Sequence, residues 1–323
     1  MSGYDVVIVN YNGEKIIKRC LRSIYASEKK PNKVIVYDNA SKDNSKEVIK
    51  SQFPKVILIE GKENIGFGRA NNAAMRYSDS KYILFSNNDL ILEKNCSKIL
   101  LDGFSDPRIA IINPIIYKGW KKSKTQPIYA FGSTTDINGF NYGLYDNWPD
   151  KSNLNCFSGA CFMARAEVIK KLKFEKSFFL YYEEAELSAR ILKQNLKIAR
   201  LIGARSYHLE SHSSPEAFTD GVAFRQFYGV QNRWFMLGKH WPCRLMFAAL
   251  LANKIHLLYL IYFFAINTKL NYTKLLYIAP ISFVRGWRAR DRKKPIDAIW
   301  YSKLVPVSLL NYFKLGKKVF SKS

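Results

Sequence analysis

Polar side chains that could bind a ligand stand where an apolar, strand-like run ends. In the stretch KYILFSNNDLILEKN, the run Tyr82–Ser86 passes directly into Asn87, Asn88 and Asp89 before apolar residues resume. Asn and Asp are good turn residues, so a simple turn is the first interpretation of this cluster. A binding site is the second interpretation, and the choice depends on what the neighbouring strand ends carry.

A second group of reactive side chains consists of the carboxylates Glu183, Glu184 and Glu186. They follow the aromatic run FFLYY and open a predicted helix that ends near Asn195. Acidic residues interact favourably with the N-terminal end of a helix dipole, which would account for them structurally. The aromatic residues before them should be buried, however, so we expect at least one carboxylate to face a pocket.

The elements that would position these residues are strands and helices in alternation. Helix-like segments occupy Glu14–Ala26, Lys42–Ser51 and Gly68–Ser78, and the first has apolar residues with a 3.6-residue period. They lie between β-branched runs at Asp5–Val9, Lys33–Tyr37, Lys55–Ile59 and Lys81–Phe85. This order predicts an α/β fold with a mainly parallel sheet, right-handed crossovers and flanking helices.

Ligands of such sheets bind at the carboxyl ends of the strands, and all four predicted ends are polar. The first run ends in Asn10-Tyr11-Asn12-Gly13, the second in Asp38-Asn39-Ala40-Ser41, the third in Glu63–Arg69 and the fourth in Asn87-Asn88-Asp89. One such end is typical of a turn, whereas four at one edge indicate a site. This comparison favours a ligand-binding role for Asp89.

Charge and cysteine content limit the function further. The 323 residues include 51 Lys and Arg against 26 Asp and Glu, a formal net charge of +25, which predicts an anionic partner such as nucleic acid, a nucleotide substrate or an acidic membrane. The five cysteines are odd in number and lack CxxC spacing, which favours a reducing compartment. The N-terminus lacks the pattern of a secretory signal.

We expect two parts, residues 1–225 with the sheet and residues 226–323 as a basic, apolar helical region. The apolar stretches of the second part are interrupted or too short to cross about 30 Å of hydrocarbon. They are Leu245–Ile266, Leu275–Val284 and Val305–Phe313, and the basic run Arg285–Lys294 lies among them. This pattern suggests helices that associate with a membrane interface, and a helical subdomain packed on the sheet is the alternative.

Six motifs, in this order, resemble those of family 2 glycosyltransferases and especially the rhamnosyltransferase-like branch. The match covers about residues 4–235, and the motifs read VIVNYNGEKIIKRCLRSI, VIVYDNASKDNS, ENIGFGRANNAAMR, YILFSNNDLILEKN, FSGACFMARAEVI and FFLYYEEAELSARILKQNLKI. The resemblance implies a Rossmann-like GT-A fold, a nucleotide-sugar donor and inversion at the anomeric carbon. It also implies a divalent metal, Mg²⁺ or Mn²⁺.

The resemblance places the donor at the polar strand ends. Asp38 matches the acidic residue that contacts the nucleoside base, and the loop and helix start that line the nucleotide match residues 64–72. Asn88 belongs to the tail of the DxD motif. The predicted donor-binding residues are therefore Asn10, Tyr11, Asp38, Asn64, Gly66, Arg69, Asn72 and Asn88.

The metal is assigned through the same motif, in which the last carboxylate holds the ion on the diphosphate. That carboxylate is Asp89, while Asn87 replaces the first Asp, so one carboxylate must serve. Mg²⁺ often takes one or two carboxylates and completes its shell with phosphates and water. His208 matches a His that helps bind the metal or diphosphate in relatives, with a structural His as the alternative and His212 as a weaker candidate.

The catalytic base is assigned to the glutamate pair. Glu183-Glu184 matches a Glu-Asp motif whose second carboxylate removes the proton from the acceptor. Because Glu184 is one methylene longer than the usual Asp, Glu183 stays open as the alternative. Glu186 matches an acidic position that we expect to be structural.

The predicted activity is transfer of a sugar from a dTDP-rhamnose-like donor or a UDP-sugar to a hydroxyl of a glycan or lipid-linked acceptor in cell-surface polysaccharide synthesis. The basic helical region adds the expectation of a cytoplasmic, peripheral protein on the anionic inner face of the cell membrane, with no nucleic-acid partner.

Three other classes fit less well. A dinucleotide-dependent oxidoreductase should carry GxGxxG after the first strand, but the nearest match, Gly66-x-Gly68-x-x-Asn71, follows the third strand and lacks the last glycine. A nucleic-acid-binding protein would explain the charge, yet the basic residues cluster with apolar helices. A catalytically inactive sugar-binding protein stays open because Asn87 and Glu184 depart from the strictest family pattern.

Overall fold

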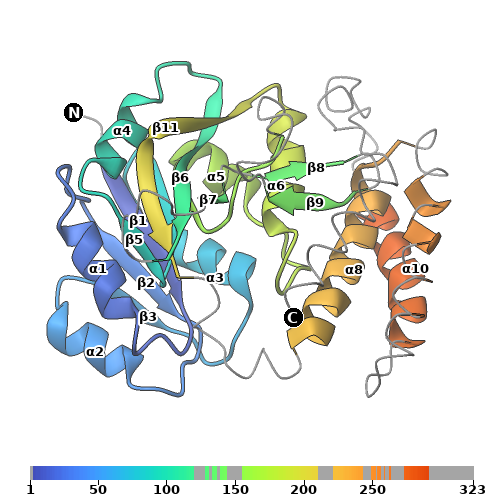
Figure 1. Cartoon of the computed structure of the whole chain (residues 1–323), viewed down its shortest axis with the longest axis horizontal. Helices are drawn as coiled ribbons and strands as arrows, with labels where there is room; N and C mark the ends of the chain where they lie inside the picture. Colours follow the sequence, from blue (N-terminus) through green and yellow to red (C-terminus); the bar gives the residue numbers. More distant parts are fainter. Residues whose placement is uncertain are drawn as a thin grey trace.

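In the computed structural model of the chain, nine strands form one central sheet in the order β3-β2-β1-β4-β10-β6-β11-β5, and β7 pairs with β6 (Figure 1). The structure describes residues 3–119, 128–130, 133–136, 139–143, 155–209, 221–242, 249–251, 253–255, 258, 262 and 273–290. The predicted stretch Val305–Phe313, the end of the basic run after Arg290 and His212 lie outside these residues.

The first four strands confirm the predicted parallel βαβ units. The strands are β1 (Tyr4–Asn10), β2 (Val34–Asp38), β3 (Ile57–Glu60) and β4 (Tyr82–Asn87), and all three pairings among them are parallel. The helices between them are α1 (Ile17–Tyr25), α2 (Ser45–Gln52) and α3 (Phe67–Ala74), with a 3₁₀ turn at Met75–Tyr77. Because the strands are parallel, their carboxyl ends lie at one edge of the sheet.

The second half adds antiparallel strands, so the predicted parallel arrangement is confirmed for β1–β4, whereas the sheet as a whole is mixed. Strand β10 (Cys161–Arg165) lies antiparallel between β4 and β6 (Ile109–Lys118). The backbone amide of Asn87 donates to the carbonyl of Ala160 (2.9 Å). Strand β10 therefore enters the sheet at the carboxyl end of β4 and must run in the opposite direction.

The remaining strands continue this mixed pattern. Strand β11 (Lys197–His208) is parallel to β6, whereas β5 (Leu90–Leu92) is antiparallel to β11 and β7 (Ile128–Ala130) is antiparallel to β6. A separate hairpin consists of β8 (Ser133–Thr135) and β9 (Asn141–Gly143).

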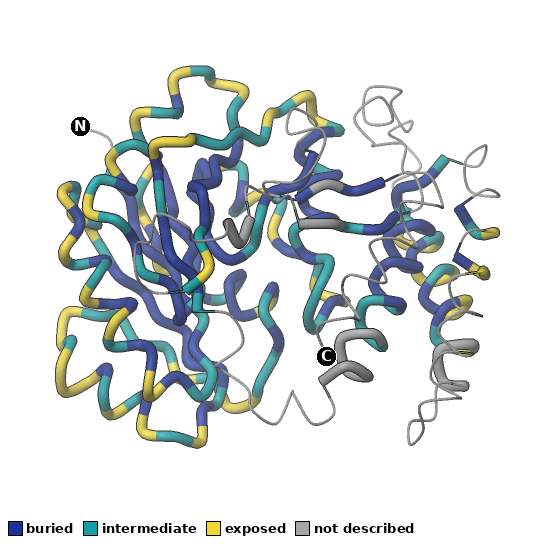
Figure 2. Tube along the Cα trace, viewed as in Figure 1, coloured by how far each residue is buried: buried dark blue, intermediate teal, exposed yellow. Residues whose placement is uncertain are grey.

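Two apolar cores cover the two faces of the sheet, as the alternation of side chains along each strand requires. On one face, Val6 and Ile8 pack with α1, α2 and α4 (Cys96–Asp102). On the other face, Val7 and Phe85 pack with α3, α5 (Ala166–Leu172) and α6 (Glu183–Leu192). Figure 2 shows the resulting buried strands at the centre and exposed residues on the outer helices and turns.

The C-terminal helices α8 (Gly221–His240) and α10 (Thr273–Arg288) lie side by side at the end of the molecule away from β3 (Figure 1). The predicted boundary at residue 225 falls inside α8. Met236 and Leu237 of α8 pack against Ala185 and Ala189 of α6, so this part of the chain contacts the sheet-bearing part closely. Among the described residues, no helix combines the length and apolar character that a membrane crossing requires.

Candidate active site

Asn10, the last residue of β1, connects the ends of β2 and β4. Its Nδ2 donates to Asp38 Oδ2 and Ser45 Oγ (both 2.9 Å), and its Oδ1 accepts from Asn88 Nδ2 (2.9 Å). All four side chains are buried. The structure therefore brings together three of the four strand ends that the sequence singled out.

Gly13 approaches this cluster so closely that it leaves no room for a side chain. A Cβ added at Gly13 would lie 2.1 Å from Asn10 Oδ1 and 2.6 Å from Asn88 Nδ2, both far below van der Waals contact. The glycine after β1 thus permits the hydrogen bond between Asn10 and Asn88.

The variant Gly13→Ala should therefore weaken nucleotide binding about tenfold, because its methyl group separates Asn10 from Asn88 at a cost of about 1.4 kcal/mol. The measurement is calorimetric titration with UDP or dTDP. Gly229→Ala is the matched control, since a Cβ added at Gly229 in α8 meets nothing within 4 Å. Unchanged affinity in a folded Gly13→Ala protein would contradict this role.

Asn39, which was not among the predicted donor residues, fixes the loop after β3. Its Nδ2 donates to Asn64 Oδ1 (2.7 Å), and its Oδ1 accepts from the amide of Ile65 (2.9 Å). Gly66 in the same loop has φ +82°, and a Cβ there would lie 2.2 Å from the carbonyl oxygen of Phe179. The position of Asn39 directly after Asp38 was the available signal, and its tertiary partner was not visible in the sequence.

Three predicted donor residues have different surroundings. Arg69 is exposed on α3, and its charge partly offsets the burial that raises the pKa of Tyr37 at the end of β2. Tyr11 is half-buried after β1. Asn72 instead forms two hydrogen bonds of 2.9 Å with the backbone of Phe174, so its amide is used structurally and its donor contact stays a prediction.

Asp89 and His208, the predicted metal ligands, meet where β5 pairs with the end of β11. Asp89 Oδ1 lies 2.9 Å from His208 Nε2, and Asn87 Nδ2 lies 3.4 Å from the same nitrogen. Both Asp89 and His208 are at most 5% exposed. The two residues therefore present an oxygen and a nitrogen to one point at the carboxyl edge of the sheet.

This pair fits a divalent ion. Asp89 Oδ1 is buried and accepts no well-directed hydrogen bond from the described residues. Neighbouring ligand atoms of a six-coordinate Mg²⁺ at about 2.1 Å stand about 3 Å apart, close to the observed separation. Within the described part of the chain, no cluster of three or more His, Cys, Asp or Glu side chains could hold a metal, so an ion here would need oxygen atoms from a diphosphate and water.

Helix α6 presents the two candidate base residues in different directions. Glu184 is half-buried and its Oε1 would lie 3.5 Å from a Cβ at Gly159, next to Ala160, whose carbonyl binds the amide of Asn87. Glu183 is 2% exposed, and its Cγ lies beside Gly68 of α3. Glu184 therefore lies near the carboxyl end of β4, which Asp89 follows in the chain.

Burial changes the acidity of both carboxyl groups. Burial, reinforced by the charge of Glu184, raises the pKa of Glu183 well above its usual value, and Glu183 Oε1 has no hydrogen-bond partner among the described residues. Burial also raises the pKa of Glu184. A raised pKa makes a carboxylate a stronger base, which suits either residue to proton transfer.

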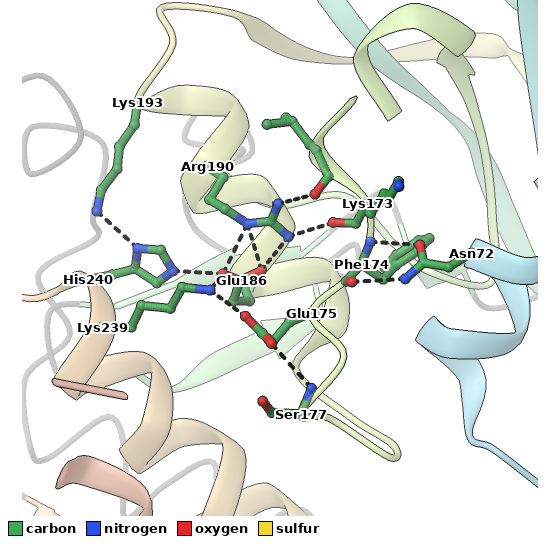
Figure 3. A network of polar contacts seen from close by, with 11 residues as sticks. Asn72, Lys173, Phe174, Glu175, Ser177, Glu186, Arg190, Lys193, Lys239 and His240 are labelled. Atoms are coloured by element: carbon green, nitrogen blue, oxygen red, sulfur yellow. Dashed lines mark hydrogen bonds and ion pairs between the residues drawn. The ribbon is translucent and has the colours of Figure 1, made fainter. Parts of the chain in front are cut away.

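Glu186 belongs to a separate buried network between α6 and α8 (Figure 3). It is fully buried and pairs with Arg190 (2.6 Å), Lys239 (2.8 Å) and His240 (2.9 Å). Burial opposes its charge, but these cationic and hydrogen-bonding partners lower the pKa of Glu186 well below its usual value. The geometry agrees with the structural role expected for Glu186.

Comparisons with known proteins agree with the motifs. The family model described as glycosyl transferase family 2 matches residues 5–173, more than half of the chain. The chain is 22% identical over 236 residues to N-acetylglucosaminyl-diphospho-decaprenol L-rhamnosyltransferase of Mycobacterium tuberculosis, covering 65% of this chain and 76% of that protein. It is also 22% identical over 227 residues to the O-antigen chain rhamnosyltransferase WbaN of Salmonella anatum, covering 68% and 70%.

Solved structures show the same fold at low sequence identity. The crystal structure of S. aureus TarS 1-349 has a TM-score of 0.57 and 16% identity, covering 97% of this chain and 92% of that one. GalNAc-T7 with UDP, GalNAc and Mn²⁺ has a TM-score of 0.59 and 16% identity, covering 75% and 49%. Since the family model covers more than half of the residues and the predicted motifs lie at one edge of the sheet, the chain belongs to glycosyl transferase family 2.

Proposed function

We propose that this glycosyltransferase moves a sugar from a nucleotide-diphosphate sugar to a hydroxyl with inversion at the anomeric carbon. The observation that carries the proposal is the 2.9 Å distance between Asp89 and His208, beside the hydrogen-bonded residues at the ends of β1, β2 and β4. Asp38 and the loop after β3, which contains Asn64, would bind the nucleoside, and Asp89 would lie at the diphosphate.

Asp89 and His208 are the residues that would hold a divalent ion, Mg²⁺ or Mn²⁺. When bound, such an ion stabilises the negative charge that gathers on a leaving nucleoside diphosphate. Glu184 would accept the proton of the acceptor hydroxyl as the hydroxyl oxygen forms the new bond to the anomeric carbon and the bond from that carbon to the diphosphate breaks. Attack from the face opposite the diphosphate inverts that carbon.

The donor and acceptor classes are supported by the relatives. Two of the similar proteins are named as rhamnosyltransferases, one of N-acetylglucosaminyl-diphospho-decaprenol and one of the O-antigen chain. Structures of TarS contain UDP or UDP-GlcNAc. We therefore propose a dTDP-rhamnose-like donor or a UDP-sugar, and a glycan or lipid-linked acceptor in cell-surface polysaccharide synthesis.

A panel of nucleotide-sugars tests this proposal. Thermal shifts are measured with each donor in Mg²⁺, Mn²⁺ or EDTA, and the donors that stabilise the protein are then assayed for release of nucleoside diphosphate. We expect one donor class to stabilise the protein only with metal and to be turned over. A protein that no nucleotide-sugar stabilises or reacts with would contradict the proposal.

We propose in addition that the C-terminal helices bind an anionic membrane surface on the cytoplasmic face. The outward side of α10 is apolar, with Tyr277, Ile281 and Val284 exposed by 70%, 53% and 44% at the spacing of one helix face, followed by the exposed Arg285 and Arg288. The same spacing recurs in another exposed set, Leu251, Ile255, Leu258 and Tyr262.

Polar residues of the same segments point inward, since Asn253 and Ser282 are at most 1% exposed. The inward side of α10 also has apolar residues, since Ala279 and Phe283 pack with Val230 and Trp234 of α8, so this helix is apolar on both sides, whereas a water-soluble surface helix has a polar outer side. Figure 1 shows α10 at the outer edge of the molecule, beyond α8. This arrangement supports insertion of the apolar side chains into a lipid interface with the arginines at the headgroups.

Replacing Tyr277, Ile281 and Val284 together by Ser should abolish flotation with vesicles of phosphatidylglycerol and phosphatidylcholine. The substitutions remove the hydrophobic contribution to membrane binding, which salt does not weaken. The Arg285→Gln, Arg288→Gln protein should lose about 1 kcal/mol per charge, and mainly the salt-sensitive part. Ile202→Ser is the control, since Ile202 is an equally exposed apolar residue (69%) on β11. Wild-type protein that does not float at low salt would refute the membrane proposal.

A further inference from the structure

The helix that carries Glu183 and Glu184 begins after an unfavourable backbone turn. Tyr181 and Tyr182 both have left-handed conformations, with φ of 70° and 71°. This conformation disfavours residues with a Cβ, and two in succession persist only when surrounding contacts fix them. The direction in which α6 starts, and with it the direction of the glutamate pair, therefore depends on contacts made by this turn.

Asn232 of α8 supplies such contacts. Its Nδ2 donates to the carbonyl oxygen of Leu180 (2.9 Å) and to that of Tyr181 (2.8 Å), and the side chain is completely buried. One amide nitrogen thus uses both of its hydrogens on two successive carbonyl groups at the start of the strained turn. Asn232 is 52 and 51 residues from these two carbonyl groups in the chain and belongs to the region that composition alone assigned to a separate helical part.

We infer that Asn232 is a positioning residue for sugar transfer, which holds the 180–182 turn so that Glu184 faces the acceptor hydroxyl. The inference rests on the proposed role of Glu184 as the base. It also gives α8 a function within the catalytic centre in addition to its contact with α10. The Asn232 amide binds the carbonyl groups of residues 180 and 181, whereas the donor loop is reached through Phe179, whose carbonyl accepts from the backbone amide of Phe67 (3.0 Å), so donor binding should depend on Asn232 less than proton transfer does.

Other contacts hold α8 in place independently of Asn232. Glu186 of α6 pairs with Lys239 and His240 near the end of α8, and Met236 and Leu237 pack on Ala185 and Ala189. Figure 3 shows this ionic network between the two helices. Shortening the Asn232 side chain should therefore release the turn while the two helices stay packed.

The variant Asn232→Ala should lower kcat for transfer about 10- to 100-fold, since a small misplacement of a reacting group has effects of this size. The donor KM should stay within about twofold of wild type, and the Tm should fall only slightly. Asn232→Ser is measured alongside and carries the test if the alanine variant does not fold. Asn253→Ala is the matched control, because Asn253 is a fully buried Asn of the same helical region that donates to the carbonyl of Ala249 (2.7 Å).

A glycine at the strained position distinguishes positioning from general stabilisation. Glycine adopts the left-handed conformation at little cost, so Tyr181→Gly should reduce the dependence of the turn on Asn232. In a double-mutant cycle, we expect Asn232→Ala to lower kcat less in the Tyr181→Gly background than in wild type. Equal losses in both backgrounds, or a kcat of Asn232→Ala within twofold of wild type, would overturn the inference.

The variant Glu184→Gln separates failure of this inference from failure of the proposed function. If Glu184→Gln loses transfer while Asn232→Ala keeps it, the base assignment stands and the positioning role is wrong. If Glu184→Gln keeps full transfer, the proposed base itself is wrong and the inference falls with it.

Discussion

Replacing Asp89 with Ala or Asn should lower metal-dependent transfer roughly 10³-fold, because several kcal/mol of charge stabilisation on the leaving diphosphate are lost. Asp89 is the one carboxylate at the end of β4, and the adjacent Asn87 and Asn88 cannot supply a second negative ligand. The variants should also bind UDP or dTDP more weakly in Mn²⁺, whereas their affinity in EDTA should equal that of wild type.

Two controls accompany the Asp89 variants. Asp102→Asn removes an exposed carboxylate at the end of α4 and should have full activity. His208→Ala removes the second ligand atom and should have a smaller effect, about tenfold, because water can replace an imidazole more easily than a charged oxygen. Near-normal turnover of a folded Asp89→Ala protein would show that the metal assignment is wrong.

The variant Glu184→Gln should lower transfer by roughly 10²- to 10⁴-fold with little change in donor affinity, the range usual for loss of a general base. Glutamine preserves the size and hydrogen bonding of the side chain but cannot accept the proton. Glu183→Gln is the matched neighbour, and because Glu183 faces α3 we expect a smaller loss from it. If Glu183→Gln shows the larger loss, the two roles are exchanged.

The pH dependence of kcat and that of stability both follow from the raised pKa of Glu184. A base must be ionised, so kcat of the wild type should fall as the pH decreases through a pKa above that of an ordinary Glu. For stability the sign is opposite: the native state holds the proton more tightly than the unfolded state, so ionisation of this half-buried carboxyl destabilises the fold as the pH rises. Glu184→Gln should therefore have a Tm at neutral pH equal to or above that of wild type.

The local order of the fold was predictable from the sequence, whereas the pairing of distant strands was not. The β-branched runs and the 3.6-residue period around Ile17 and Leu21 identified β1–β4 and α1–α3 within a few residues. The antiparallel insertion of β10 depends on where its chain re-enters the sheet, which is a tertiary property. The runs themselves are equally apolar in either direction and contain no signal for it.

The candidate site divides in the same way. Asn10, Asp38 and Asn88 stand at strand ends and were found by position, and the structure joins them by hydrogen bonds. Asn39 and Asn232 act through backbone groups 25 or more residues away, which no spacing in the sequence reveals. The different directions of Glu183 and Glu184 likewise became visible only once α6 was placed beside Gly68 and Gly159.

Calorimetric titration of the full chain with UDP and dTDP, in Mn²⁺ and in EDTA, tests whether metal binding at Asp89 supports binding of the diphosphate. If Asp89 and His208 hold a metal ion against a diphosphate at the carboxyl edge of the sheet, at least one nucleotide should bind at least tenfold more tightly with Mn²⁺. That difference should disappear in Asp89→Asn. Equal affinity with and without metal in the wild type, or a metal effect that persists in Asp89→Asn, would show that this metal site does not exist.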